Sequence, residues 1–210
     1  MRFTVVVLTV LALAAAAAPA AASGKVVVIG DRAAANNVPW RGTGYDALRF
    51  QCLWAQGEIA AAGYVNGVAF EKTTAATGRF NNVRAWLCHT SKTELERTFA
   101  NNYTGNTPVA VLNMRSVTVD GTGWFDLRIQ PTRFNYNNRD NLLLELRWNG
   151  DSGVSVPCWR SSRRNSRCYA PDNTASAGTV FNNGQRIRLT IGTMTAVEPT
   201  SLGRVKTLFR

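Results

Sequence analysis

The sequence predicts an all-β protein: an antiparallel two-sheet β-sandwich of the jelly-roll type, with helix confined to short turns. Three observations support this fold class. Apolar and polar residues alternate with a period of two, as in strands that bury one face. Turn-forming pairs such as Asp120-Gly121 and Asn149-Gly150 separate these runs at near-regular intervals. After residue 25, no stretch has the 3.6-residue period of a long amphipathic helix.

Six segments carry the strand pattern, at residues 65–70, 80–88, 109–114, 124–129, 141–148 and 186–191. The inward-facing side chains of the last three are expected to be buried: Phe125, Leu127, Ile129, Leu142, Leu144, Leu146, Ile187, Leu189 and Ile191. Two helical turns are predicted. One lies near residues 55–62, and the other spans residues 91–99, where Thr93 and Glu96 fit a capping box.

The N-terminus is predicted to be a secretory signal peptide, residues 1–22. Arg2 precedes an apolar run, Pro19 ends it, and small residues lead to cleavage after Ala22. The strongly apolar core of that run is shorter than the ~20 residues that a membrane span needs. The mature chain is therefore expected to be exported, either extracellular or on a cell surface, with no membrane span. It divides into an N-terminal arm (23–37), the sandwich (38–193) and a C-terminal linker with a basic tail (194–210).

Export makes disulfides the expected state of the four cysteines, which allow three pairings. Cys158 and Cys168 bracket a short polar segment and are predicted to form one disulfide. Cys52 and Cys88 lie in apolar runs and are predicted to bridge neighbouring strands or to stay buried as free thiols. With no Cys-x-x-Cys pair and one histidine, His89, neither a metal site nor a cofactor is expected. His89 itself is interpreted as a hydrogen-bonded structural residue at the end of a strand.

The chain resembles a β-sandwich module of secreted and surface proteins from several bacterial phyla, adhesin-like proteins that often carry C-terminal sorting signals. The residues that carry the resemblance are Val38-Pro39-Trp40, Arg49-Phe50-Gln51-Cys52-Leu53-Trp54, Gly57-Glu58-Ile59, Val68-Ala69-Phe70, the run from Val83 to Thr93, Phe99-Ala100-Asn101-Asn102-Tyr103, Gly123-Trp124-Phe125, Phe134-Asn135-Tyr136 and Asp140-Asn141-Leu142-Leu143. The resemblance covers residues 38–193. Its motifs are specific for the module and not for an activity, so it implies fold and location rather than a reaction.

Positive charge is the most informative feature of the composition. The chain has a formal net charge of +11, and most of its basic residues are arginines. One cluster falls between two of the cysteines, with flanking aromatic residues: Arg160, Arg163, Arg164, Arg167, Trp159 and Tyr169. Guanidinium groups beside aromatic rings suit a polyanion, either an acidic glycan or a nucleic acid. The alternative is a solvated loop in a chain with a compositional bias towards arginine.

These features predict an exported, non-catalytic binding or structural module that adheres to a cell surface or matrix, with acidic polysaccharide as the leading ligand. One alternative is a filament subunit that self-associates by strand exchange through the β-prone segment 25–29. The other is a glycan-active enzyme, which would need a carboxylate pair such as Glu58 and Glu145.

Overall fold

The computed structural model describes residues 24–129 and 132–192 and confirms the all-β prediction. The largest sheet has six antiparallel strands in the order β12 (Thr179–Phe181), β11 (Arg167–Ala170), β3 (Ala47–Trp54), β9 (Asn141–Asn149), β5 (Gly78–Thr90) and β6 (Val109–Val119). A five-stranded sheet has the order β1 (Lys25–Ile29), β14 (Ile187–Gly192), β4 (Gly63–Glu71) and β7 (Trp124–Arg128), with β8 (Phe134–Tyr136) also pairing with β4. A small sheet contains β13 (Gly184–Gln185), β10 (Cys158–Ser161) and β2 (Ala34–Asn36).

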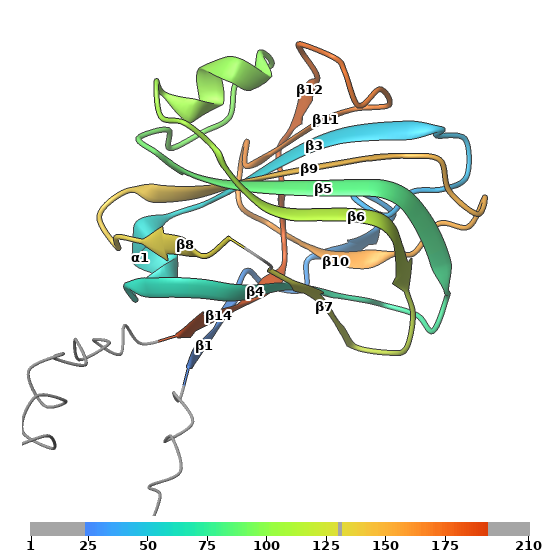
Figure 1. The fold of residues 1–210 in the computed structure, drawn as a ribbon, viewed down its shortest axis with the longest axis horizontal. Helices are drawn as coiled ribbons and strands as arrows, with labels where there is room; N and C mark the ends of the chain where they lie inside the picture. Colours follow the sequence, from blue (N-terminus) through green and yellow to red (C-terminus); the bar gives the residue numbers. More distant parts are fainter. Residues whose placement is uncertain (1–23, 130–131, 193–210) are drawn as a thin grey trace, which may run out of the picture.

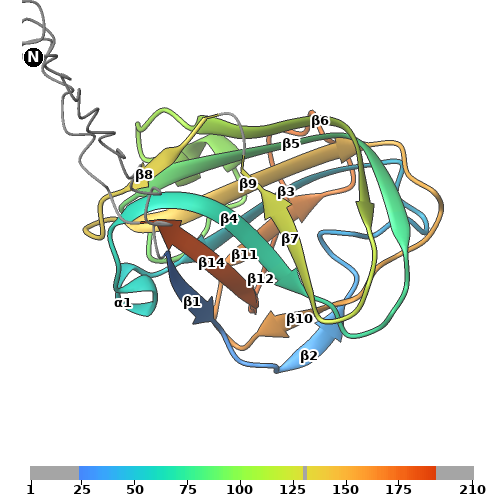
Figure 2. The same ribbon diagram turned by 60° about the horizontal axis from the view of Figure 1, so that its bottom comes forward.

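The two larger sheets form the layers of a sandwich (Figure 1). Figure 2 shows β4, β7 and β14 running across the strands of the six-stranded sheet at an angle. The small sheet continues from the end of β4, because Lys72 forms an isolated bridge with Cys158 of β10. Sheets pack in this way because each strand directs alternate side chains to one face, and the two apolar faces are buried together.

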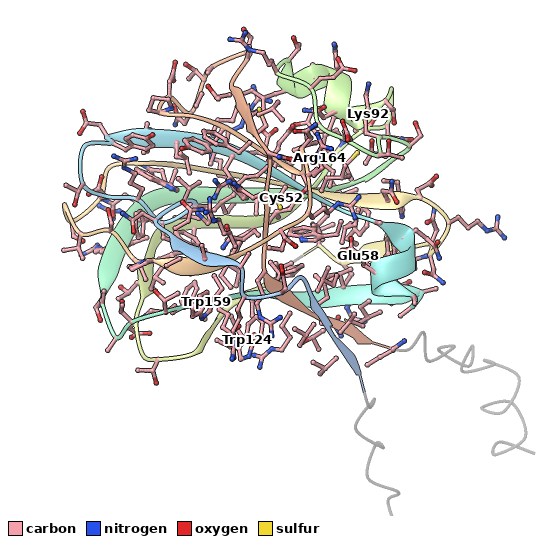
Figure 3. All side chains as sticks on the ribbon, turned by 180° about the vertical axis from the view of Figure 1, so that it is seen from behind. Cys52, Glu58, Lys92, Trp124, Trp159 and Arg164 are labelled. Atoms are coloured by element: carbon pink, nitrogen blue, oxygen red, sulfur yellow. The ribbon has the colours of Figure 1, made fainter. Side chains whose placement is uncertain are left out.

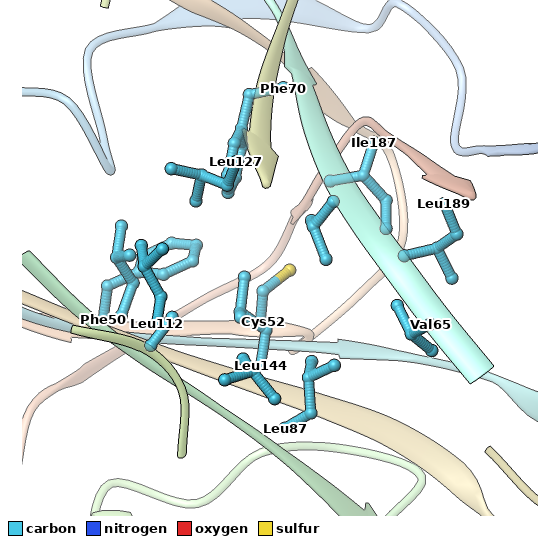
Figure 4. Close-up of a cluster of buried hydrophobic side chains, with 14 of the residues drawn as sticks. Phe50, Cys52, Val65, Phe70, Leu87, Leu112, Leu127, Leu144, Ile187 and Leu189 are labelled. Atoms are coloured by element: carbon cyan, nitrogen blue, oxygen red, sulfur yellow. The ribbon is translucent and has the colours of Figure 1, made fainter. Parts of the chain in front are cut away.

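Between the layers lies one large hydrophobic core (Figure 4). Of the nine side chains predicted to be buried, seven are buried, and Phe125 and Ile129 are half-buried against the core. Phe125 lies on β7, the outermost of the described strands of its sheet, so only one side of β7 pairs with another of these strands. The period-two pattern therefore identified the buried face correctly.

The N-terminal arm contributes to this sandwich through β1. All five residues of β1 pair antiparallel with β14, from Lys25 opposite Ile191 to Ile29 opposite Ile187. Strand exchange through this segment stays a prediction. The predicted signal peptide and the C-terminal linker and tail lie outside the described residues. In the part of the chain that the structure describes, no helix is long and apolar enough to cross a membrane.

One of the two predicted helical turns is present. The helix α1 (Gln56–Ile59) lies within the first predicted segment, and Glu58 Oε2 accepts a hydrogen bond from the Ala55 N–H at 2.8 Å. The prediction of helix over residues 91–99 was wrong, since the 3-10 helix η1 (Phe99–Tyr103) begins only at the end of that segment. There the backbone N–H groups bond to partners outside the segment instead: Leu95 to the Asn165 carbonyl and Glu96 to the Asn102 side chain.

His89 is a structural histidine near the end of β5, as the sequence suggested. Its Nε2 accepts a hydrogen bond from the Asn137 N–H at 3.2 Å, and its ring packs against Phe134 and Tyr136. Burial lowers the pKa of His89, and the nearby charge of Asp140 only partly opposes this effect. The ring is therefore neutral in the folded protein at neutral pH.

Protonation of His89 should destabilise the fold as the pH falls. Because the pKa is lower in the folded chain than the usual 6.5, the unfolded chain takes up the proton first, and stability is lost below that value. We expect the free energy of unfolding to fall between pH 7.5 and 5.5, with a slope no steeper than about 1.4 kcal/mol per pH unit. Urea unfolding across this range would measure it. His89→Gln should flatten the slope, since the chain has no other histidine; an unchanged slope would contradict the assignment.

Candidate functional site: an arginine row on the outer face of the six-stranded sheet

Three arginines lie side by side across the centre of the six-stranded sheet. Arg49 of β3 is in register with Arg147 of β9, which is in register with Arg84 of β5. All three point away from the core, because their neighbours along the strands, such as Leu48 and Leu146, point into it. Like charges directly opposite each other destabilise a sheet, so this arrangement needs negative charge nearby.

Glu145 supplies part of that charge from the neighbouring outward-facing position on β9, two residues before Arg147. Its side chain is 1% exposed, and it forms ion pairs with Arg49 and Arg147. Glu145 Oε2 also accepts hydrogen bonds from Gln51 Nε2 at 2.7 Å and from the Tyr103 hydroxyl. With four side chains donating to one carboxylate, Glu145 joins β3, β9 and η1 at the site.

Tyr103 comes from η1 and is held in the site as a hydrogen-bond donor. Burial raises the pKa of Tyr103 to about 12, and the negative charge and hydrogen bond of Glu145 act in the same direction. The hydroxyl therefore keeps its proton at any physiological pH. Gln51 links Glu145 to η1, because its Oε1 accepts a hydrogen bond from Asn102 of η1 at 2.8 Å. This polar network fixes η1 over the sheet.

Two adjoining cavities open beside the arginine row, and we call them together the outer groove. One, of about 380 Å³, is lined by Asn82, Arg84, Trp86, Arg147, Asn149, Asn173 and Thr174. The other, of about 300 Å³, is lined by Arg49, Trp86, Tyr103, Pro108, Glu145 and Arg147. Trp86 and Arg147 line both cavities. The groove therefore combines an indole ring, a tyrosine ring, three guanidinium groups and several amide side chains.

The loop between β11 and β12 forms one wall of the outer groove and is tied to the arginine row. Arg49 Nη1 donates to the Ala175 carbonyl at 2.7 Å, and Arg147 Nη1 donates to the Asn173 carbonyl at 3.3 Å. The Arg147 guanidinium also lies 5.1 Å from the centre of the Trp86 ring, within the range of a cation–π interaction. Arg84 is different: it is exposed and forms no ion pair with any described residue.

No family model, curated protein or solved structure matches this chain. The chemistry of the outer groove is therefore the basis for assigning a function.

The arginine cluster predicted from the sequence does not form one exposed patch. Arg167 is buried on β11, and Arg163 forms an ion pair with Glu58 on α1. Arg160 is half-exposed on β10, whereas Arg164 is exposed and donates to Asn182 Oδ1 at 3.2 Å. The segment between Cys158 and Cys168, in which these arginines lie close together in sequence, connects two strands of different sheets, β10 and β11.

The aromatic residues predicted to flank this cluster are likewise separated. Trp159 lies on β10 in the small sheet, and Figure 3 shows it well apart from Arg164. Tyr169 lies on β11, where its ring stacks on Phe181 at 4.6 Å between centres. Polyanion binding by this set stays a prediction, but the common exposed surface on which it depended is absent.

The predicted disulfides are wrong, because all four cysteines are buried free thiols. Cys52 and Cys158 belong to the core between the sheets, whereas Cys88 and Cys168 belong to a smaller cluster under η1. Each predicted pair, 158–168 and 52–88, thus joins residues on opposite sides of the six-stranded sheet. The alternative reading of Cys52 and Cys88 as buried thiols is the one that the structure supports.

The carboxylates considered for catalysis belong to different environments. Glu58 forms its ion pair with Arg163, and Glu145 is bound by the donors of the outer groove. Among residues 24–129 and 132–192, no three His, Cys, Asp or Glu side chains are close enough together to hold a metal ion.

Arg49, Arg84, Arg147 and Trp86 were not predicted as site residues from the sequence. The alternation of the strands places each of them on an outward face, which is a usable signal. Their adjacency depends on the register of three strands that are far apart in the chain, and no local pattern contains that information.

Proposed function

We propose that this protein is an exported, non-catalytic binding module whose outer groove holds an acidic polysaccharide, as in adhesion to a cell surface or matrix. The observation that carries the proposal is the arginine row beside Trp86. Three guanidinium groups face one carboxylate there, so the groove has an excess of positive charge. Arg84 in particular has no carboxylate partner among the described residues and is free to take one from a ligand.

The remaining groups of the groove suit a sugar chain. The indole of Trp86 offers an apolar surface on which the flat face of a pyranose ring can pack. Asn82, Asn149 and Asn173 supply amide donors and acceptors for hydroxyl groups. Guanidinium groups bind carboxylate and sulfate in a bidentate manner, which selects acidic sugars over neutral ones.

Two features favour binding over catalysis. The carboxylate of Glu145 is already bound by four side chains of the protein. No other acidic residue lines the outer groove, so the pair of carboxylates that glycoside hydrolysis uses is not found among its lining residues.

The proposal can be tested with polygalacturonate and heparin as probes and dextran as the neutral control. We expect the wild-type protein to bind both acidic polymers, to lose them as salt is raised, and to ignore dextran. Arg84→Ser should weaken binding about tenfold or more, since hydrogen bonds to charged groups are worth about 1.5–3 kcal/mol. Trp86→Ala should also weaken binding, through the loss of the stacking surface. Isothermal titration calorimetry would measure each affinity.

Arg164→Ser is the matched control, because it removes the same charge from an exposed position away from the groove. If both serine variants weaken binding equally, only the net charge of the protein matters and the groove is not the site. If the wild-type protein binds neither acidic polymer, the proposal fails altogether.

A further inference from the structure

A second, separate feature is a buried arginine with no counter-charge. Arg167 is 3% exposed and lies on the inner face of the six-stranded sheet, in register with Cys52. It forms no ion pair with any described residue, and its Nε and Nη1 are enclosed without a hydrogen-bond partner in the described chain. A buried charge of this kind is strongly unfavourable unless something compensates it.

The surroundings of Arg167 compensate only part of the free-energy cost of burying its charge. Its guanidinium lies 5.0 Å from the ring centre of Phe181 and 5.7 Å from that of Tyr169, so cation–π attraction contributes. Arg160 brings a second positive charge close by. Burial, and to a lesser extent Arg160, lowers the pKa of Arg167 to about 10, a value at which the group is still charged at neutral pH.

Unpaired acceptors occur in the same part of the fold. Gln185 Oε1 and Asn183 Oδ1 are buried without a hydrogen-bond partner in the described chain. Gln185 lies on β13 opposite Arg160 of β10, and Asn183 lies in the turn that connects β12 to β13. A ligand for this corner therefore needs an anionic group for the arginine, whereas the amide oxygens can accept hydrogen bonds from water or from the hydroxyl groups of a sugar acid.

We propose that Arg167 and Arg160 form a small oxyanion site, which binds sulfate or the carboxylate of a sugar acid in the corner between β11, β10 and β13. This site is distinct from the outer groove, because Arg167 lies on the inner face of the six-stranded sheet and neither Arg167 nor Arg160 lines that groove. Water molecules could satisfy the unpaired donors and acceptors, but they bring no negative charge. The two explanations therefore predict different responses to anions.

Thermal unfolding at constant ionic strength distinguishes anion binding from hydration by water. We expect sulfate, exchanged for chloride, to raise the Tm, by roughly 5–10 °C when its concentration is about 100 times the Kd. Acetate and glucuronate serve as further probes. Stabilisation by sulfate and acetate alone indicates a site for a free ion, whereas stabilisation by glucuronate as well indicates a site for a sugar acid. An unchanged Tm with all three probes overturns the proposal.

Variants show which residues the stabilisation by sulfate requires. Arg167→Met removes the buried charge and keeps an unbranched, shorter apolar chain, so it should fold at least as stably as the wild type in chloride and lose the response to sulfate. Arg164→Met is the matched control from the exposed surface and should keep the response. Arg84→Ser should keep it too, which separates this site from the outer groove. If Arg167→Met does not fold, Arg160→Gln provides the test, because it should weaken the response; an undiminished response in Arg160→Gln contradicts the site.

Discussion

Replacing Glu145 with alanine should lower the free energy of unfolding by about 3–5 kcal/mol, the usual cost of removing one partner from a buried ion pair. The carboxylate neutralises Arg49 and Arg147 and accepts hydrogen bonds from Gln51 and Tyr103. Without it, two guanidinium groups in adjacent cross-strand positions would repel each other, and the amide and hydroxyl would lose their acceptor. Urea or guanidinium denaturation followed by circular dichroism would measure the change.

Glu94→Ala is the matched control, because Glu94 is exposed and accepts one hydrogen bond, from Asn165. Exposed substitutions of this kind usually change stability by less than about 0.5 kcal/mol. A loss below about 1 kcal/mol in Glu145→Ala would mean that the arginines find other partners, and the account of the arginine row would be wrong.

The four cysteines of the folded protein should resist thiol reagents almost completely. Burial raises the pKa of Cys52 and Cys158 to about 12 and that of Cys88 and Cys168 to about 11, so almost no thiolate is present at pH 7. All four side chains are also shielded from solvent. Labelling should therefore proceed through unfolding and be slowed by about a thousandfold or more relative to the denatured chain.

Mass spectrometry after treatment with iodoacetamide checks this prediction. Without any reductant, we expect no label on the native protein and four labels on the protein in guanidinium chloride. Two or fewer labels under denaturing conditions would reveal a disulfide. Rapid labelling of the native protein would show that at least one thiol is accessible.

The strand pattern and the core could be predicted because both depend on residues close together in the chain. Alternating side chains point to opposite faces of a strand, so Leu142, Leu144 and Leu146 identify a buried face without knowledge of any partner strand. The capping pattern at residues 93–96 did not predict a helix correctly, because the hydrogen bonds there depend on residues outside the segment. The Glu96 N–H bonds to Asn102 in η1, and the Leu95 N–H bonds to the distant Asn165 carbonyl, so contacts outside the segment replaced the helical hydrogen bonds.

The candidate sites could not be predicted in the same way. Proximity along the chain suggested that Arg160, Arg163, Arg164 and Arg167 form one patch, yet β10 and β11 belong to different sheets. The arginines that do lie together, Arg49, Arg84 and Arg147, come from three strands and meet through register alone.

The sequence by itself determined the fold class, the buried faces of its strands and the positive charge of the chain, because each is a property of composition or of short-range periodicity. The tertiary structure alone decided which charges are neighbours and which thiols share a side of the sheet. Cys52 and Cys88 show the physical reason. Cys52 is opposite Leu144 on β9 and Cys88 is opposite Leu143, and this difference of one residue places their sulfurs on opposite faces. Strand register is set by the packing of the whole core, so no segment of the sequence specifies it alone.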